Sequence, residues 1–374
     1  MIMAKKIGRN DKCWCGSENK YKKCHLDRDK KTRPSIEEAR KVYKKTFSKK
    51  YCLHPEANSN TCKGGIVKAH SIQRGGGLSC IAEDNHVYRL MPKVTYSPPS
   101  YSIDVERIGI NDASTFNGFC NFHDNNTFSC IEKYPFEASI DQIFLLAYRA
   151  QCRETFMKNN QFELLPLMRE MDKGRNLSEQ REIQEYVAYY GHGVALGVDT
   201  SMKQKAKYDC ALLNNDYSDL IYYVVFFDNR PELLCSGASI LETDFLGRGY
   251  NQLGRSDIDQ EEVTFSIIPT DKGLAVAFAS LDRGKDTQAF FSSLSSLGED
   301  NLPNAIVRYA FEYYENTYFS QLWWKSLNPF TQQAIRRRFS SGISPDSLRG
   351  NDCLLDDGIN MVTWQINKIV KKIT

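Results

Sequence analysis

Four side chains of the zinc-binding type lie close together near the start of the chain, at Cys13, Cys15, Cys24 and His25. One residue separates the first two, and an adjacent Cys-His pair follows after eight more. Three thiolates and an imidazole are the type and number of ligands that close a tetrahedral structural zinc site, with no position left open for chemistry. The segment has few apolar side chains for a core, so it needs a metal to fold. We therefore predict a zinc knuckle over residues 1–27.

The residues around these ligands follow a known pattern. They comprise a Gly-Arg-Asn-Asp run at 8–11, a Cys-x-Cys-Gly-Ser core at 13–17 and a Lys-Tyr-Lys-Lys-Cys run at 20–24. This arrangement resembles the SEC-C motif, the short zinc-binding tail of the preprotein translocase ATPase, which recurs on many unrelated bacterial proteins. Lys12 and Trp14 stand where prolines are usual. The resemblance implies a module that can contact a protein or the ribosome, and it does not identify the function of the whole chain.

Composition limits the class of protein. A chain of 374 residues with 41% hydrophobic content is long enough for two or three cores. It contains no run of about twenty apolar residues that could cross a membrane. The first six residues lack the apolar centre of a secretory leader, so we expect a cytoplasmic protein. In that compartment, twelve cysteines indicate metal sites and buried thiols and not a disulfide framework.

Charge is unevenly distributed along the chain. Residues 1–50 contain 17 lysines and arginines against 6 aspartates and glutamates, a net charge of +11, and the remainder carries 32 against 40, a net charge of −8. A basic arm of this kind can bind nucleic acid through its phosphates. It can equally bind an acidic protein surface or form a solvated, solubilising face.

The pattern along the chain predicts a multidomain α+β protein. Ser35 with Glu38 predicts a capped helix that continues to about residue 50. Two long helices are expected over 137–212, with a break at Gly191-His192-Gly193, and a β-hairpin around Thr270-Asp271-Lys272. A long aromatic helix is expected over 302–327. The predicted domains are a SEC-C zinc knuckle at 1–27, a basic linker helix at 28–50, a treble-clef-like zinc domain at 51–136, a helical connector at 137–212 and a mixed sheet and helix domain at 213–374.

A second set of potential ligands occurs between positions 51 and 130. Each of its side chains can bind a metal or transfer a proton. They are Cys52, Cys62, His70, Cys120, His123 and Asp124. Their order resembles the HNH family of treble-clef nucleases, in which a cysteine pair precedes a strand that ends in a catalytic histidine. A glycine-bearing loop and a second pair of zinc ligands then follow. The nine residues between Cys52 and Cys62 and the long stretch between His70 and Cys120 depart from the usual spacing.

This resemblance implies specific roles. Cys52, Cys62, Cys120 and His123 would bind structural zinc, His70 would deprotonate water, and Asp124 would bind Mg²⁺ or Mn²⁺ where the family usually has a histidine. The implied activity is metal-dependent hydrolysis of nucleic acid, of the kind found in anti-phage or toxin systems. In the alternative interpretation, His70 binds zinc with Cys62, Cys120 and His123, and Cys52 is a buried thiol. The protein would then be a nonenzymatic zinc adaptor.

Overall fold

The computed structural model describes residues 7–96, 99–250, 255, 257–343 and 349–373 and confirms a mixed α+β architecture. The first six residues, on which the expectation about a leader rests, lie outside this range. The chain forms two compact units, one of Met1–Lys49 with Met157–Asp199 and the other of Lys50–Phe156 with Thr200–Thr374. Within the described residues, no helix combines the length and apolar character needed to cross a membrane.

The first unit combines the predicted knuckle with helices. Its N-terminal part contains two 3-10 turns, Tyr21–Lys23 and Arg28–Lys30, and helix α1 (Ile36–Phe47). The capping box at the start of α1 is confirmed, since the Glu38 backbone N–H donates to Ser35 Oγ at 3.1 Å and the Ser35 backbone N–H donates to Glu38 Oε2 at 2.8 Å. Satisfying these two backbone donors fixes where the helix begins.

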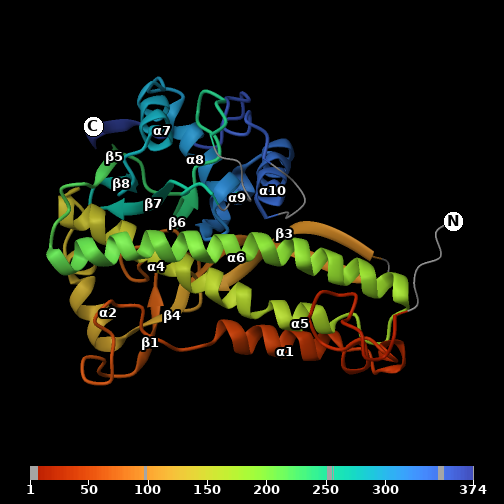
Figure 1. Ribbon diagram of the computed structural model, residues 1–374. Helices are drawn as coiled ribbons and strands as arrows, with labels where there is room; N and C mark the ends of the chain where they lie inside the picture. The colour runs from red at the N-terminus through yellow and green to blue at the C-terminus, as the bar shows by residue number, and fades with distance from the viewer. Residues whose placement is uncertain (1–6, 97–98, 251–254, 256, 344–348, 374) are drawn as a thin grey trace. The chain divides into compact units, whose positions relative to one another are not determined.

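Two long helices contribute residues to both units, and a short helix lies between them in sequence. They are α4 (Ile140–Glu163), α5 (Leu165–Glu170) and α6 (Leu177–Asn214), and the long ones are conspicuous in Figure 1. The predicted break at Gly191-His192-Gly193 is wrong, because α6 continues through it. A Cβ on Gly191 would lie 3.3 Å from Leu165 Cδ1, so this glycine accommodates the close approach of α5.

The second unit contains, in the described part of the chain, an eight-stranded sheet of order β10-β5-β8-β7-β6-β9-β2-β3 with antiparallel neighbours. Its strands are β2 (His86–Tyr96), β3 (Pro99–Gly109), β5 (Ile221–Phe227), β6 (Leu233–Ile240), β7 (Glu262–Thr270), β8 (Gly273–Ser280), β9 (Thr317–Phe319) and β10 (Ile366–Lys372). The predicted hairpin around residues 270–272 is confirmed, since Thr270 pairs with Gly273.

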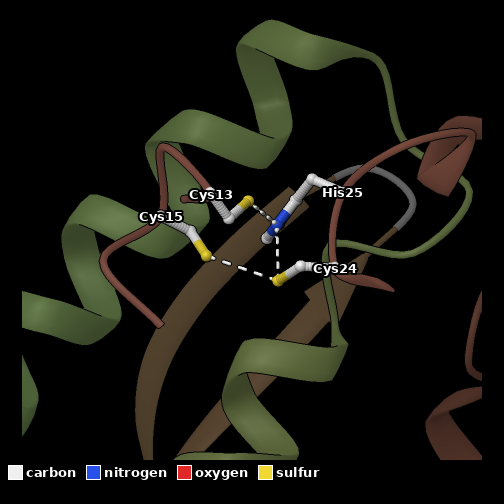
Figure 2. Close-up of side chains that lie close together, drawn as sticks. All are labelled: Cys13, Cys15, Cys24 and His25. Atoms are coloured by element: carbon white, nitrogen blue, oxygen red, sulfur yellow. Dashed lines mark hydrogen bonds between the residues drawn. The ribbon is translucent and has the colours of Figure 1, made fainter. Parts of the chain in front are cut away.

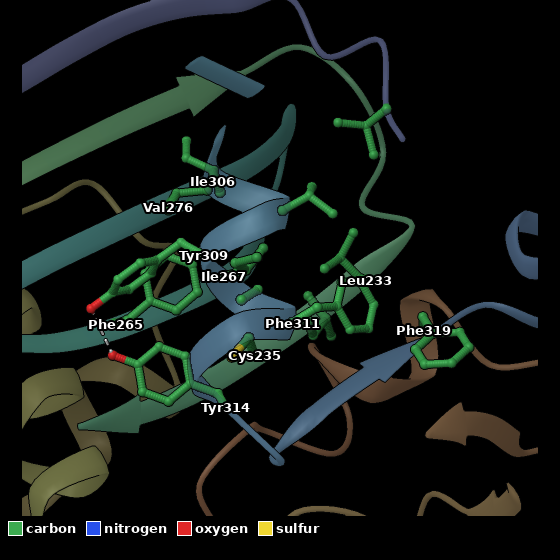
Figure 3. Close-up of a cluster of buried hydrophobic side chains, with 14 of the residues drawn as sticks. Leu233, Cys235, Phe265, Ile267, Val276, Ile306, Tyr309, Phe311, Tyr314 and Phe319 are labelled. Atoms are coloured by element: carbon green, nitrogen blue, oxygen red, sulfur yellow. Dashed lines mark hydrogen bonds between the residues drawn. The ribbon is translucent and has the colours of Figure 1, made fainter. Parts of the chain in front are cut away.

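Helices cover this sheet and complete its core. They are α7 (Lys285–Ser295), α8 (Leu302–Tyr313), α9 (Gln321–Ser326) and α10 (Pro329–Ile343). Figure 3 shows α8 lying over the strands, with Tyr309 near Phe265 of β7. The single helix predicted over 302–327 is wrong, because the chain turns extended at Tyr314 and forms β9 between β6 and β2.

A smaller two-stranded sheet precedes the large one in sequence. β1 (Ile66–His70) pairs antiparallel with β4 (Thr115–Cys120), and helices α2 (Asn121–Thr127) and α3 (Ser129–Glu132) follow directly. The chain between β1 and β4 contains the 3-10 turn Leu78–Cys80 and then the β2–β3 hairpin of the large sheet. One insertion thus joins the predicted zinc region to the C-terminal strands.

Candidate metal centres

Backbone hydrogen bonds shape the N-terminal knuckle before any metal is considered. Cys13 N–H donates to the Asn19 carbonyl oxygen at 2.8 Å, and Lys12 bridges Lys20, so the chain doubles back between them. Gly16, with a φ of +74°, lies in this turn, where a side chain would be strained. The 3-10 turn at 21–23 then ends at Cys24 and brings His25 toward the first two cysteines.

The four candidate ligands converge as predicted, as Figure 2 shows. His25 Nδ1 lies 3.2 Å from Cys13 Sγ and 3.1 Å from Cys24 Sγ, and the sulfurs of Cys15 and Cys24 are 3.5 Å apart. A tetrahedron with zinc–ligand lengths of about 2.0–2.3 Å has edges of roughly 3.3–3.8 Å. The observed separations are within a few tenths of an ångström of these edges, so the four residues fit a zinc ion.

Burial and hydrogen bonding affect these thiols differently. Burial raises the pKa of Cys13 to about 12, so this thiol keeps its proton at neutral pH unless a cation replaces it. Burial acts in the same direction on Cys15, but hydrogen bonds with Ser17, Cys24 and Cys13 together outweigh it and lower the pKa of Cys15 to about 7. Burial also raises the pKa of Cys24, so zinc binding would release protons from the knuckle, chiefly from Cys13 and Cys24.

A second group forms where β4 meets α2. Cys120, at the end of β4, caps α2 by accepting the His123 backbone N–H at 3.4 Å. His123 Nδ1 lies 3.3 Å from Cys120 Sγ, 3.4 Å from Cys52 Sγ and 3.7 Å from Cys62 Sγ. With the knuckle, this second group of three thiols and one imidazole makes the chain compatible with one or two zinc sites.

His54 accompanies this second group, although its turn-rich sequence context did not indicate a ligand. Its ring stacks on that of His123 with centroids 4.1 Å apart and planes at 4°. Burial, with the neighbouring His123, lowers the pKa of His54 to about 4, so its imidazole is neutral at physiological pH. His54, Glu56 and His123 also offer ligand atoms within 4.8 Å of one another.

His70 lies at the end of β1 and belongs to neither Cys/His group in the described part of the chain. Its Nε2 is 3.3 Å from the Ile110 carbonyl oxygen. Burial lowers the pKa of His70, the Ile110 carbonyl opposes this, and the cations Arg74, Lys68 and Arg149 reinforce it. The half-buried imidazole is therefore mainly neutral at physiological pH.

Asp124 occupies the first turn of α2, one residue after His123. Its Oδ1 is buried and makes no hydrogen bond within the described residues. Burial raises the pKa of this carboxyl group, with Arg149 opposing and Glu132 reinforcing the effect. Arg149 itself forms an ion pair with Glu132, with Nη2 2.6 Å from Oε1, and its Cζ lies 4.0 Å from the centroid of the Phe128 ring.

Two sets of buried polar residues near the candidate sites were not found from the sequence. Asp172 lies 2.8 Å from His25 Nε2, the ring nitrogen that faces away from the cysteines. Beside His70, Ser71 and Ser114 share a hydrogen bond of 2.6 Å, and the Ser114 backbone N–H donates to the Tyr318 hydroxyl at 2.7 Å. Serine, tyrosine and aspartate are too common for their positions alone to have indicated these contacts.

Comparison with known proteins identifies one part of the chain. A family model for the SEC-C motif matches residues 9–27, the segment that contains all four ligands of the knuckle. No curated protein and no solved structure matches the chain. The match supports zinc binding by the knuckle and leaves the remaining residues to be interpreted from their own geometry.

Proposed function

We propose that this chain is a zinc-binding bacterial cytoplasmic protein that cleaves nucleic acid with His70 as general base. The observation that carries the proposal is the position of His70 at the end of β1, outside both Cys/His groups but in the same small sheet as Cys120. The proposal is supported by an antiparallel strand pair that is followed at once by a helix, with zinc-type ligands at the junction, because an HNH-like domain would require this order.

The environment of His70 suits a base. A carbonyl oxygen only accepts hydrogen bonds, so the contact with Ile110 places the imidazole proton on Nε2 and leaves the lone pair on Nδ1. A neutral imidazole with its lone pair on Nδ1 can take a proton from water. Zinc at Cys52, Cys62, Cys120 and His123 would hold β4 and α2 in place beside it.

The buried carboxylate of Asp124 supports the proposal that a divalent cation other than zinc, Mg²⁺ or Mn²⁺, also binds. Its buried Oδ1, which has no hydrogen-bond partner among the described residues, is an oxygen ligand of the kind these hard cations prefer. One carboxylate is a usual protein contribution to a Mg²⁺ site, because water and substrate phosphates supply the other ligands. A bound cation would stabilise negative charge on the scissile phosphate and the leaving oxygen.

The charge distribution supports a polyanionic substrate, since residues 1–50 carry a net charge of +11. A role in an anti-phage or toxin system follows from the HNH resemblance alone. The second candidate is a nonenzymatic zinc adaptor whose SEC-C knuckle contacts a protein or the ribosome. One observation favours it: each Cys/His group already offers the four ligands that close a structural zinc site, and in the described residues no group of three potential metal ligands includes Asp124.

Replacing His70 with alanine tests the proposal. Full-length wild-type protein, His70→Ala and the control His86→Ala are incubated with DNA and RNA in the presence of Mg²⁺ or Mn²⁺, and the zinc content of each is measured. His86 is a suitable control because it is also partly exposed and lies outside both groups. We expect cleavage by wild type and His86→Ala, no cleavage by His70→Ala, and equal zinc in all three.

The other outcomes separate the alternatives. Zinc loss in His70→Ala would identify a structural ligand, because metal binding in such domains is coupled to folding. Retained cleavage would remove His70 from the mechanism. If wild-type protein cleaves none of these nucleic acids with either cation, the adaptor is the better description.

A further inference from the structure

The turn between α5 and α6 places a buried carboxylate against the N-terminal knuckle. The Asp172 side chain is fully buried and accepts hydrogen bonds from three donors. These are His25 Nε2 at 2.8 Å, Arg28 Nε at 2.5 Å and Gln184 Nε2 at 2.8 Å. All four residues belong to the first unit, although Asp172 is 147 positions away from His25 in the sequence.

These contacts determine which nitrogen of His25 can bind a metal. An ionised carboxylate only accepts hydrogen bonds, so the bond to Asp172 places the imidazole proton on Nε2. Nδ1 then keeps its lone pair, and it is Nδ1 that faces Cys13 and Cys24. A carboxylate behind a zinc-binding histidine fixes both the tautomer and the ring orientation, and it raises the basicity of the ligand.

We infer that Asp172 is a positioning residue of the N-terminal zinc site, which presents His25 Nδ1 to the metal and so makes zinc affinity depend on the α5–α6 turn. This inference does not depend on the proposed nuclease activity. It assigns a role to a residue outside the segment that matches the SEC-C model.

The surrounding chain holds the carboxylate in place. Arg28 also donates to the Arg169 carbonyl oxygen at 3.1 Å, and the Gly174 backbone N–H donates to the Arg28 carbonyl oxygen at 3.0 Å. Gly174 has a φ of +69°, and a Cβ there would lie 2.7 Å from the Lys31 carbonyl oxygen. The chain after the knuckle thus lies directly against the turn that contains Asp172, in an arrangement that requires glycine.

The substitution Asp172→Asn removes the negative charge and alters the His25 tautomer while it keeps the size of the side chain. Its amide nitrogen must face either His25 or Arg28. Facing His25, it would donate to Nε2 and move the imidazole proton to Nδ1, the metal-binding nitrogen. If the amide nitrogen faced Arg28, its N–H and the guanidinium N–H would both be donors, and neither could accept a hydrogen bond. Both orientations weaken the knuckle, although the side chain hardly changes in volume.

The test measures zinc retention of the full chain against a series of chelator concentrations. The Cys13→Ser, Cys15→Ser double variant identifies which part of the release curve belongs to the other site. We expect Asp172→Asn to lower affinity at the N-terminal site about 10- to 100-fold, the usual effect of losing such a carboxylate. Release from the second site should not change. An unaltered curve would overturn the inference.

A second background distinguishes positioning from general support of the fold. His25→Cys replaces the imidazole with a thiolate, which binds zinc in a four-cysteine site and has no tautomer to fix. In this background, Asp172→Asn should change zinc affinity less than about 3-fold. An equal loss in both backgrounds would show that Asp172 acts only through the fold, contrary to the inference.

One measurement on the wild-type protein needs no variant to fold. Nitrogen-15 NMR of the zinc-loaded full chain reports which ring nitrogen of each histidine is protonated and which is metal-bound. We expect His25 to show a metal-bound Nδ1 and a protonated Nε2 whose hydrogen exchanges slowly, because Asp172 buries it. Zinc on Nε2, or an Nε2 proton in rapid exchange, would overturn the inference.

Discussion

At the scale of single residues, the knuckle ligands lead to the most direct prediction. Cys13→Ser with Cys15→Ser removes two of the four donors in the first group, so the purified protein should lose at least one zinc per chain. Cys80→Ser with Cys210→Ser is the matched control, because both of these cysteines are exposed and belong to neither group. Metal analysis of both variants and wild type gives the answer, and equal zinc in all three would contradict the assignment.

A second residue-scale prediction concerns Glu312, whose side chain is buried in the second unit. Burial raises its pKa to about 7; Arg349, whose Nε lies 3.7 Å away, opposes this but also pairs with Glu242. Between about pH 4.5 and 7 the folded protein therefore holds a proton that the unfolded chain has released. The free energy of unfolding should fall across this window as pH rises, by about 3 kcal/mol in total.

Urea unfolding at a series of pH values tests this effect. Glu312→Gln, which has no charge to desolvate, should flatten the decline between pH 5 and 7. Glu299→Gln, at an exposed glutamate, should leave it unchanged. If wild type and Glu312→Gln show the same pH dependence, the buried carboxyl does not retain its proton.

The candidate ligands could be selected from the sequence because cysteine and histidine at short spacings have few other uses. Cys13 to His25 needed only local turns to meet. Asp172 could not be selected, because it is one of 46 acidic residues and only the fold brings it to His25. His70 was selected by its place at the end of a β-like run, and its hydrogen bond to Ile110 depends on the insertion after β1.

At the scale of elements, local rules succeeded where hydrogen bonds are local. The capping box of α1 and the two-residue turn between β7 and β8 involve neighbours in sequence. The predicted helix over 302–327 was wrong for the opposite reason. Asn316 donates to the Ser236 carbonyl oxygen at 2.7 Å and to Ser71 Oγ at 3.0 Å, so distant partners hold this segment beside β6. Aromatic spacing carries no information about such partners.

β9 provides the element-scale prediction. Tyr318→Phe removes the hydroxyl that accepts the buried Ser114 backbone N–H, next to the residue paired with His70. An unpaired buried donor costs about 1–3 kcal/mol, so the free energy of unfolding should fall by that amount. Tyr134→Phe, at a residue with 67% exposure, should change it by less than about 0.5 kcal/mol. Urea titrations of both variants decide, and equal stability would mean that water or a local shift satisfies Ser114.

At the scale of the whole molecule, each compact unit is built from chain segments that are distant in sequence. The first unit joins residues 1–49 to 157–199, and the second contains a sheet whose strands come from both sides of α4, α5 and α6. Composition and periodicity indicated the mixed α+β class, but neither reports which segments pair. The insertion of the β2–β3 hairpin into the large sheet had no local indication for the same reason.

The charge asymmetry is also a property of the whole molecule, and it leads to the last prediction. Arg40, Lys41, Lys44 and Lys45 are exposed on α1, so phosphates of a nucleic acid can reach them. Replacing all four with glutamine should weaken binding at low salt. It should also reduce the slope of log affinity against log salt by roughly 0.7–0.9 for each phosphate that the helix no longer neutralises.

The variant with four glutamines on α1 tests the basic arm better than a deletion of residues 1–50 would. The deletion would also remove His25 and Arg28 and leave Asp172 buried without them. The matched control replaces four exposed cations of the second unit, Lys272, Lys285, Lys325 and Arg337, with glutamine. Because both variants change the net charge equally, a nonspecific effect of charge would lower both slopes alike. A decrease confined to the α1 variant would identify this helix as the polyanion-binding surface, and unchanged slopes in both would give the basic arm another partner.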